Sequence, residues 1–480
     1  MAEKVSKSKK ETQGITVKKS EDMSEWYNEV VLKSGMADFA PIGGCMIIRP
    51  HGYAVWERIH AALDRMLKES GHKNAYFPMF IPERFLKKEA DHFEGFNPEV
   101  AWVEDENERY AVRPTSETII YDAYSKWLRS WRDLPILLNQ WCNIVRWETK
   151  VTKIFLRTRE FLWQEGHTVH ATEDEADEEV MKILDFYEKL AEDYLAVPVI
   201  KGRKSEAEKF AGAYYTTAIE SLMPDGKSLQ MGTSHNLGQH FSKVFDIKYL
   251  DKDGKYKRVW QTSWGVSTRL IGSVIMTHGD DRGLVMPPRI APIQVVIVPI
   301  IFDRDRKRVF DECEKLRKVL SRKWEVHFDS RDSYSAGWKF NEWEMKGVPI
   351  RIEIGPKDVA KKQAVMVLRD TGEKKSVKMG ELPKAIDEEL EAMQKRLLDK
   401  ARKVMNSSMV EAKTYNDVKV SVAEKKMVHA FWCGDPGCEE AVKNDTAATI
   451  RVIPFEQKEK GKCIVCGKKA DTKVYFARAY

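Results

Sequence analysis

Long apolar runs are what this sequence lacks most clearly. The longest, over residues 290–302, is interrupted by Pro292, Gln294 and Pro299, and it is shorter than the roughly 18 apolar residues that a membrane-spanning helix needs. The first twenty residues hold six lysines and two glutamates but lack the apolar segment of a secretory signal. We therefore expect a protein that has no membrane span and stays in the cytoplasm.

Cysteine is scarce and unevenly placed. The chain has seven, an odd number, and four of them gather in the last fifty residues as Cys433 and Cys438, then Cys463 and Cys466. This distribution disfavours a disulfide framework and favours reduced thiols. Four thiolates at these spacings can close a tetrahedral zinc site without an open position, so we expect one structural Zn2+, with unmetallated thiols as the alternative.

Neither sign of charge is in large excess, since 80 basic and 74 acidic residues give a net charge of +6 over 480 residues. This balance permits a polyanionic partner and also fits a solvated basic tail. The length suggests about three domains. The predicted parts are a basic flexible arm over residues 1–20, a first domain over 21–287, an α/β domain over 288–383 and a C-terminal domain over 384–480.

Hydrophobic spacing in the first domain favours an antiparallel sheet flanked by helices. One helix begins after a capping box formed by Thr172 and Glu175. The aromatic and β-branched runs expected as strands cover residues 76–81, 143–147, 161–164 and 259–264.

The pattern changes after residue 287. Strands and helices then alternate, which predicts a separate α/β domain with a mainly parallel sheet. A helix with a single apolar stripe follows Pro383 and leads into the cysteine-containing C-terminal domain. The expected strands of the α/β domain cover residues 294–298, 324–328, 350–354 and 364–369, and its first helix covers residues 304–320.

The strongest chemical signal is a pair of strands that carry charged and aromatic side chains. Arg146 and Glu148 alternate on the first strand, and Arg157 and Phe161 follow an eight-residue connection. Alternation with period two brings such side chains to one sheet face. An arginine can bind a phosphate, a ring can stack on a purine and a carboxylate can accept the adenine amine, so these are parts of an ATP site. A surface salt bridge would also explain the Arg-x-Glu pair alone.

Together with two further segments, this strand pair resembles motif 2 of the class II aminoacyl-tRNA synthetases. G-H-K-N-A-Y-F-P-M-F-I-P over residues 71–82 resembles motif 1, and W-G-V-S-T-R over residues 264–269 resembles motif 3. The resemblance implies a homodimer interface at motif 1 and catalysis by Arg146 and Arg269, with Arg269 on the ATP γ-phosphate. Taken separately, Pro82 could simply end a strand, and Gly265 could lie in a loop before a basic helix.

Within that class, R-P-T-S-E-T over residues 113–118 resembles the loop with which prolyl-specific members hold the substrate amine. Thr115 and Glu117 can accept both hydrogens of a secondary ammonium group, while Arg146 takes the carboxylate. The same three residues, Thr-Ser-Glu, also suit the start of a helix, so this loop is expected to serve as cap and as binding loop.

Three more segments, over residues 163–168, 209–213 and 230–235, resemble further parts of prolyl enzymes. Ordinary core packing is the alternative for each of their side chains. The proline pocket implied by the resemblance consists of Thr115, Glu117, Arg146, Trp163, Glu165, His167, Phe210 and His235. The implied ATP site consists of Arg146, Glu148, Arg157, Phe161, Gln230, Thr233 and Arg269.

The resemblance, which covers nearly the whole chain, implies a class II antiparallel sheet with flanking helices, an α/β anticodon-binding domain and a small zinc-binding α+β C-terminal domain. It implies activation of L-proline by ATP with Mg2+ and transfer to tRNA(Pro), without an inserted editing domain, a membrane or DNA. The family also ends in a tyrosine, as this chain does at Tyr480. Rivals are a regulatory paralogue, and the same chemistry with threonine, serine or glycine.

Overall fold

The computed structural model describes residues 14–90, 99–147 and 151–480. These pack into two compact units. The smaller unit contains Ile48–Val55 and His278–Met393 with the described residues before Phe39, and the larger unit contains Phe39–Ile47, Trp56–Thr277 and Gln394–Tyr480. No helix within the described ranges has both the length and the apolar character needed to cross a membrane.

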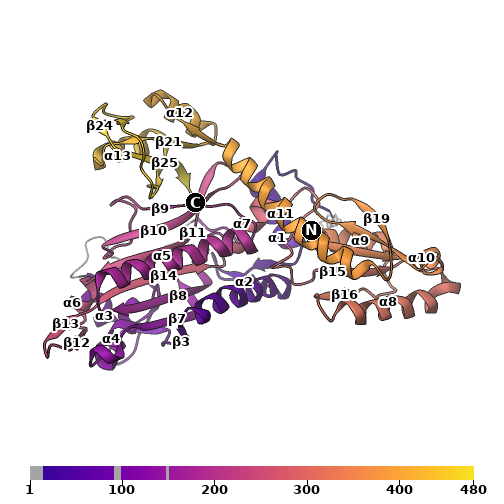
Figure 1. Ribbon diagram of the computed structural model, residues 1–480, viewed down its shortest axis with the longest axis horizontal. Coiled ribbons are helices and arrows are strands. Elements are labelled where there is room, and N and C mark those ends of the chain that lie inside the picture. Colours follow the sequence, from indigo (N-terminus) through magenta and orange to yellow (C-terminus); the bar gives the residue numbers. More distant parts are fainter. Residues whose placement is uncertain (1–13, 91–98, 148–150) are drawn as a thin grey trace, which may run out of the picture. The chain divides into compact units, whose positions relative to one another are not determined.

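An eleven-stranded sheet forms the centre of the larger unit (Figure 1). Its five middle strands pair antiparallel with one another, which confirms the antiparallel sheet expected from the sequence. In spatial order they are β10 (Tyr215–Leu222), β11 (Lys227–Gly238), β14 (Trp260–Ser267), β8 (Glu160–His170) and β7 (Ile136–Val145).

The C-terminal module, residues 409–480, extends this same sheet. Its last strand, β25 (Thr472–Ala479), runs parallel to β11 over two residue pairs, Lys227 with Arg478 and Ser228 with Ala479. The C-terminal strand is thereby paired with β11 in the eleven-stranded sheet. Further strands of the sheet are β3 (Lys73–Asn74), β9 (Ile200–Arg203), β20 (Met409–Glu411), β21 (Met427–Trp432) and β22 (Ala448–Val452).

Helix α5 (Glu173–Lys189) packs across β10, β11 and β14 (Figure 1). It begins at the predicted capping box, in which the Thr172 hydroxyl accepts from the Glu175 amide and the Glu175 carboxylate accepts from the Thr172 amide. The helix buries an apolar stripe, so amphipathic spacing and cap chemistry agree on its position. The buried residues of α5 are Ala176, Glu179, Val180, Ile183, Leu184 and Tyr187.

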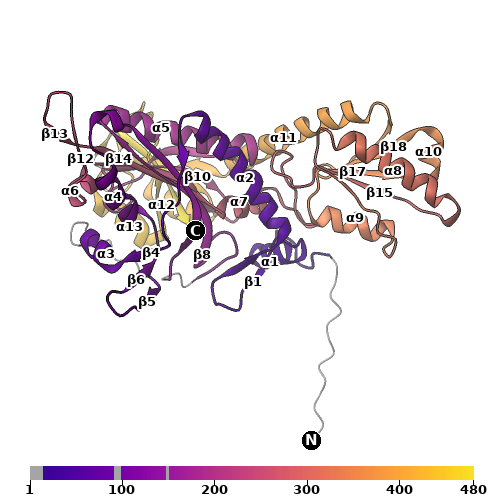
Figure 2. The ribbon, with the colours of Figure 1, turned by 90° about the horizontal axis from the view of Figure 1, so that it is seen from below.

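The smaller unit contains the predicted α/β domain, but its sheet is mixed rather than mainly parallel. Strand β15 (Val295–Pro299) pairs parallel with β16 (Val326–Phe328) and β17 (Ile350–Ile354). Strands β18 (Gln363–Leu368) and β19 (Lys374–Lys378) then add antiparallel, because a short turn joins them into a hairpin. Figure 2 shows helices α8 (Arg306–Leu320) and α9 (Ala336–Met345) beside these strands.

Asp280 links three segments of the smaller unit. Its carboxylate accepts two hydrogen bonds from the Arg369 guanidinium at 2.8 and 2.6 Å, and its carbonyl accepts one from the Trp26 indole at 3.1 Å. Within the predicted arm, Lys19 donates to the Gly279 carbonyl at 2.8 Å. Bidentate pairing of this kind fixes orientation as well as charge.

The strand predicted over residues 76–81 is wrong for most of its length, because only Phe80 to Pro82 form strand β4 (Phe80–Pro82). Side-chain hydrogen bonds to the backbone take the place of the hydrogen bonds that a neighbouring strand would make. The Gln140 amide oxygen accepts from the Phe77 amide at 2.5 Å, and the Arg113 guanidinium donates to the Phe77 carbonyl at 2.9 Å. A backbone bonded in this way needs no neighbouring strand.

The remaining elements complete the described part of the chain. The helices are α1 (Met23–Lys33), α2 (Pro50–Glu69), α3 (Glu83–Ala90), α4 (Glu117–Trp127), α6 (His240–Val244), α7 (Arg269–His278), α10 (Pro356–Lys361), α11 (Leu382–Ser407), α12 (Tyr415–Ala423), α13 (Pro436–Thr446), η1 (Trp131–Asp133), η2 (Leu190–Tyr194) and η3 (Asp303–Asp305). The strands are β1 (Ala37–Phe39), β2 (Met46–Ile48), β5 (Trp102–Val103), β6 (Tyr110–Val112), β12 (Lys248–Leu250), β13 (Tyr256–Arg258), β23 (Gly461–Lys462) and β24 (Lys469–Ala470).

We expect Gly166→Ala to destabilise the larger unit. Gly166 lies opposite Trp264 in the β8–β14 ladder, and an added Cβ would meet the indole ring at 2.0 Å. Because Trp264 is only 2% exposed, its ring has little room to move. Overpacking of this kind costs about 1 to 3 kcal/mol. Urea unfolding measures the loss, with Gly43→Ala as control since no atom lies within 4 Å of its added Cβ. Equal midpoints for both variants would contradict the packing described.

Candidate active site

One cavity of about 210 Å³ opens over strands β8, β11 and β14. It is lined by every residue predicted for the proline pocket. Those eight are Thr115, Glu117, Arg146, Trp163, Glu165, His167, Phe210 and His235. Residues that are up to 120 positions apart in the sequence therefore meet at one face of the sheet.

Strand β8 supplies the floor of the cavity by simple alternation. Trp163, Glu165 and His167 all face it, whereas the Gln164 side chain points to the other side and accepts a hydrogen bond from the Tyr187 hydroxyl of α5 at 2.8 Å. A strand turns successive side chains to opposite faces. The sequence pattern aromatic, polar, acidic, glycine, histidine is thus sufficient to place three lining side chains.

The loop before helix α4 faces the cavity instead of capping the helix with a side chain. Ser116 occupies the N-cap position but makes no side-chain cap hydrogen bond. Its hydroxyl donates to Glu165 at 2.5 Å, and the Thr115 hydroxyl donates to the Glu117 carboxylate. The predicted double role is therefore wrong for the cap, because both hydroxyls are used on carboxylates of the cavity.

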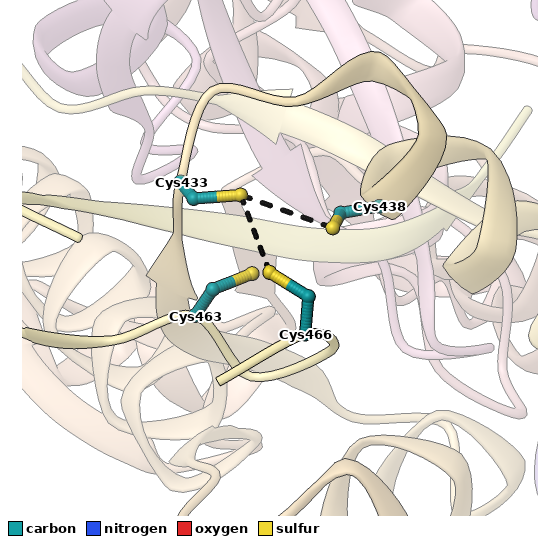
Figure 3. Close-up of side chains that lie close together, drawn as sticks. All are labelled: Cys433, Cys438, Cys463 and Cys466. Carbon is teal, nitrogen blue, oxygen red and sulfur yellow. Dashed lines mark hydrogen bonds between the residues drawn. The ribbon is translucent and has the colours of Figure 1, made fainter. Parts of the chain in front are cut away.

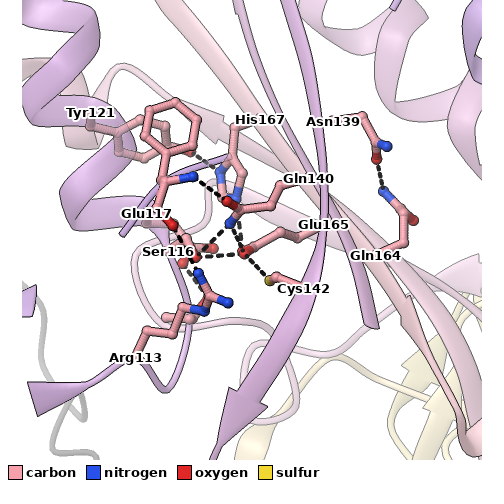
Figure 4. A network of polar contacts seen from close by, with 12 residues as sticks. Arg113, Ser116, Glu117, Tyr121, Asn139, Gln140, Cys142, Gln164, Glu165 and His167 are labelled. Carbon is pink, nitrogen blue, oxygen red and sulfur yellow. Dashed lines mark hydrogen bonds and ion pairs between the residues drawn. The ribbon is translucent and has the colours of Figure 1, made fainter. Parts of the chain in front are cut away.

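Glu165 is the centre of a buried polar network (Figure 4). Its carboxylate accepts hydrogen bonds from Gln140 at 2.8 Å, from the Cys142 thiol at 3.4 Å and from Ser116, and it pairs with His167 at 3.0 Å. Burial acts to raise the pKa of Glu165, but these donors, His167 first, outweigh burial and lower it. The carboxylate is consequently held in its ionised form inside the protein.

The two histidines of the cavity carry different charges. Burial opposes the positive charge of His167, yet the hydrogen bond to Glu165 and the nearby Glu117 raise its pKa. Burial and the charge of His167 lower the pKa of His235 to about 3, so that ring is neutral. The neutral His235 ring lies 4.9 Å from the ring of Phe210, and together they form an uncharged wall.

A second cavity of about 320 Å³ contains most of the residues predicted for ATP. Arg146, Arg157, Phe161, Gln230 and Arg269 line it. Thr233 lines the first cavity instead. Glu148 lies outside the described residues.

Arg146 lines both cavities and so marks their boundary. Its guanidinium carbon lies 5.6 Å from the ring centroids of Phe161 and of Trp163, within the range of cation–π attraction. Gln230 and Glu208 also line both cavities. A molecule in one cavity is thereby adjacent to a molecule in the other.

Arg269 is held at the start of helix α7 by two backbone carbonyls. It donates to Leu156 at 3.0 Å and to Gln230 at 3.2 Å. Burial, followed by the charges of Arg146, Arg157 and Arg451, lowers the pKa of Arg269 to about 10, although Glu220 acts in the opposite direction. An excess of positive charge in a confined space is stabilised by an anion.

Sequence reasoning missed Glu208, Ser228 and Arg451, which also line the second cavity beside Tyr480. The only available signal for Arg451 was a charged residue within the short apolar strand β22. Glu208 precedes a predicted segment by one position and shows no pattern of its own. Their places depend on how the C-terminal module folds back along β11.

The four clustered cysteines form a second candidate site in the C-terminal module (Figure 3). All four sulfur atoms lie within 4.8 Å of one another, and the Cys433 sulfur is 3.8 Å from that of Cys438 and 3.7 Å from that of Cys466. Zinc–sulfur bonds of about 2.3 Å in a tetrahedron separate the sulfurs by about 3.8 Å. The cluster therefore fits a tetrahedral metal ion, with Cys463 as the fourth ligand.

Comparison with protein families agrees with this fold. Residues 101–278 match the tRNA synthetase class II core domain (G, H, P, S and T), and residues 294–389 match an anticodon binding domain. Residues 415–480 match the C-terminal domain of prolyl-tRNA synthetase. The antiparallel sheet with its two cavities is thus the core of a class II aminoacyl-tRNA synthetase, a class of ligases.

Similar individual proteins show which family within this class the chain belongs to. The chain is 56% identical over 469 residues to the proline–tRNA ligase of Natranaerobius thermophilus, with 96% of this chain and 97% of that protein covered. It is 52% identical to proline–tRNA ligase 2 of Clostridioides difficile, with the same coverage. The crystal structure of prolyl-tRNA synthetase from Cryptosporidium parvum, complexed with halofuginone and AMPPNP, matches at 45% identity and a TM-score of 0.93 over 98% of this chain and all of that one. The chain belongs to the prolyl-tRNA synthetase family.

We expect the stabilising effect of the Glu165–His167 pair to be greatest near pH 5 to 6. A raised pKa of His167 means that its contribution is complete below the ordinary histidine value of about 6.5 and is lost as pH rises through the raised pKa. The lowered pKa of Glu165 means that its contribution is lost as pH falls through that pKa. Urea unfolding of wild type and His167→Gln between pH 5 and 9 measures the difference.

The matched control is Tyr124→Phe, which removes the uncharged hydrogen bond of 2.8 Å from the Tyr124 hydroxyl to the backbone carbonyl of His167. Its cost should be nearly constant over this pH range. A cost of His167→Gln that did not shrink towards pH 9 would contradict a charged pair.

Proposed function

We propose that the protein activates L-proline with ATP and transfers the prolyl group to tRNA(Pro). The observation that carries this proposal is the position of Arg146 between a cavity rich in carboxylates and a cavity rich in guanidinium groups. A carboxylate substrate in the first and a polyphosphate in the second would meet at this side chain. Membership of the prolyl-tRNA synthetase family supports the same reaction.

In the proposed first cavity, Thr115 and Glu117 accept the two hydrogens of the proline ammonium, and Arg146 binds the carboxylate. The pyrrolidine ring has no other polar group, so it is bound by shape. Trp163, Phe210 and the neutral His235 supply the uncharged walls. Glu165 and His167 lie beneath these groups and hold the ionic network together.

In the proposed second cavity, Phe161 stacks on adenine and Glu148 accepts its amine. Arg146 binds the α-phosphate, and Arg269 and Arg157 bind the outer phosphates, with Gln230 and Thr233 close to the nucleotide. Magnesium enters with ATP as part of the substrate and neutralises charge on the outer phosphates. Each assigned side chain is of the type that its target requires.

The proposed reaction has two steps. An oxygen of the proline carboxylate attacks the α-phosphorus while the bond to pyrophosphate breaks, which yields prolyl-adenylate. A ribose hydroxyl at the 3′ end of tRNA then attacks the prolyl carbonyl, and AMP leaves. Arg146 and Arg269 contribute by positioning and by stabilising developing charge, and no covalent protein intermediate is formed.

The other parts of the chain receive matching roles in this proposal. The domain over residues 288–383 binds the tRNA anticodon, in keeping with its family match. A homodimer forms around residues 71–82, where Tyr76 and Phe80 are 70% and 45% exposed within a single chain. Three domain boundaries stay predictions: a basic arm over residues 1–20, a catalytic domain over 21–287 and a C-terminal domain over 384–480. We also propose that the protein is located in the cytoplasm, where tRNA is charged.

We further propose that the four cysteines hold one structural zinc ion. Four thiolates leave no open coordination position, so the ion would stabilise the module without taking part in the reaction. The segment between β8 and β14 contains α5, η2, β9, β10, β11, α6, β12 and β13. The absence of an inserted editing domain stays a prediction.

Arg146→Ala should abolish proline-dependent exchange of pyrophosphate into ATP. The substitution removes the one arginine that appears among the described lining residues of both cavities, and loss of one such charge-stabilising group lowers rates by about 100- to 1,000-fold. The control Arg132→Ala removes an exposed arginine whose guanidinium lies over the Trp131 ring, outside both cavities, and the variant should exchange as wild type does. Wild-type exchange should depend on proline among all twenty amino acids. Exchange retained by Arg146→Ala would refute the site, and stimulation by threonine, serine or glycine alone would refute the substrate.

Cys463→Ser should abolish stoichiometric zinc binding and lower the unfolding temperature. It removes one of four ligands whose sulfur atoms already stand at the spacing of a tetrahedral site, and structural zinc contributes directly to folding. Elemental analysis of the purified chain and thermal unfolding measure both effects. Cys45→Ser, outside the cluster, should retain one zinc ion per chain. A wild-type chain purified without zinc, or a variant that retained it, would contradict the assignment.

A further inference from the structure

A buried group of four charged side chains joins the C-terminal module to the catalytic sheet. Arg451 comes from β22, Glu220 from β10, and Lys204 and Glu208 from the segment after β9. Arg451, Glu220 and Lys204 are each less than 7% exposed. Two positive and two negative charges make the group neutral as a whole, which is the condition under which buried charges are tolerated.

Arg451 is held by acidic side chains along two edges of its guanidinium. Nη2 donates to Glu220 at 2.7 Å, and Nη1 donates to Glu208 at 3.0 Å and to the Thr449 hydroxyl at 2.9 Å. Burial opposes its charge, but Glu220 outweighs burial and raises the pKa of Arg451. The side chain therefore stays charged in a fixed orientation.

The backbone around Arg451 is fixed as well. The Lys204 ammonium donates to the Arg451 carbonyl at 2.8 Å and to Glu220 at 2.6 Å. On the next residue but one, the Ile453 amide donates to the Arg203 carbonyl at 2.8 Å. A side chain anchored at both ends is pre-organised, so a ligand that meets it need not order it first.

Arg451 lines the second cavity together with Arg146, Arg157 and Arg269. Four guanidinium groups thus surround one space, with Glu208 as the acidic side chain among its lining residues. Three of the arginines belong to the predicted catalytic domain. The fourth, Arg451, lies on β22, more than 180 positions further along the chain than Arg269. Guanidinium groups gathered around such a space favour a polyanion.

We propose that Arg451 is a fourth phosphate-binding arginine, contributed by the C-terminal module, that binds the outer phosphates of ATP and the pyrophosphate product. This inference rests on the proposed function, because it requires ATP in the second cavity. It makes the C-terminal module part of the adenylation site. The alternative is that Arg451 serves only as an ion-pair brace between the module and β10.

The test separates phosphate binding from bracing by comparing two ligands of the same cavity. Calorimetry measures the affinities of the full-length protein for a non-hydrolysable ATP analogue with Mg2+ and for adenosine, which lacks phosphates. Arg451→Gln, whose amide can still donate to Glu220, should lower the affinity for the analogue by about 10- to 100-fold, which is the usual effect of losing a charged hydrogen bond. Its affinity for adenosine should change by less than about threefold. Arg451→Lys should recover part of the loss.

Lys204→Gln is the matched control, since Lys204 belongs to the same ionic group but does not line the cavity. It should lower thermal stability while the ratio of the two affinities stays at the wild-type value. An unchanged ratio in Arg451→Gln, or an equal change in Lys204→Gln, would overturn the proposal. If Arg451→Gln does not fold, the double variant Glu220→Gln/Arg451→Gln keeps the buried group neutral and carries the same expectation.

The failure of this inference and the failure of the proposed function give different results. If wild type binds neither the analogue nor adenosine, the ATP site itself is misplaced. If wild type binds both and the Arg451 variants keep the wild-type ratio, the ATP site stands and only the role of Arg451 is refuted. Pyrophosphate should show the same pattern as the analogue, because both carry the outer phosphates.

Discussion

The register of β8 between β7 and β14 is the constraint on which the candidate site depends. Ten residue pairs join β8 to β7 and eight join it to β14, so its backbone cannot shift without breaking both ladders. A shift by one residue would turn Phe161, Trp163, Glu165 and His167 away from the cavities together. The other face is equally specified, because Gln164 bonds to Tyr187 and Gly166 leaves room for the Trp264 ring. Packing on the far side of the sheet thus positions the chemistry on the near side.

Charge is divided between the two cavities in a way that matches two different ligands. The first holds Glu117 and Glu165 next to a protonated His167, which leaves acceptors for a cationic amine. The second holds several arginines, one of them with its pKa lowered to about 10 by burial and by its neighbours. That lowering reflects burial first and the confinement of like charges second, and an anionic ligand would oppose both effects. Arg146 lines both cavities, so in the proposed reaction the carboxylate and the phosphate are brought together at one guanidinium.

Features that depend on local periodicity could largely be predicted from the sequence. Alternation predicted the strand that carries Phe161, but the strand expected to carry Arg146 ends one residue earlier, at Val145. The capping box predicted the start of α5, and the cysteine spacing predicted a cluster that the fold brings together. Local pattern failed where side chains replaced backbone pairing, as at Phe77, and where a hairpin completed the smaller sheet antiparallel. It also failed for Glu208 and Arg451, since nothing in their neighbourhood indicates which strand they will face. Contacts between distant segments are decided by tertiary packing, which periodicity does not encode.

The attachment of the C-terminal module depends on buried charge as well as on strand pairing. Strand β25 joins β11 through only two residue pairs, which would bind weakly and tolerate a shifted register. The Lys204–Glu220–Arg451 group removes that tolerance, because any other register would leave charges buried without partners. Buried ion pairs contribute little net stability compared with apolar packing, but separating them costs several kcal/mol, about 3 to 5 in typical cases. The module is therefore fixed by the penalty for misplacement more than by attraction, and a group fixed in this way can hold an arginine at the precision that a phosphate site needs.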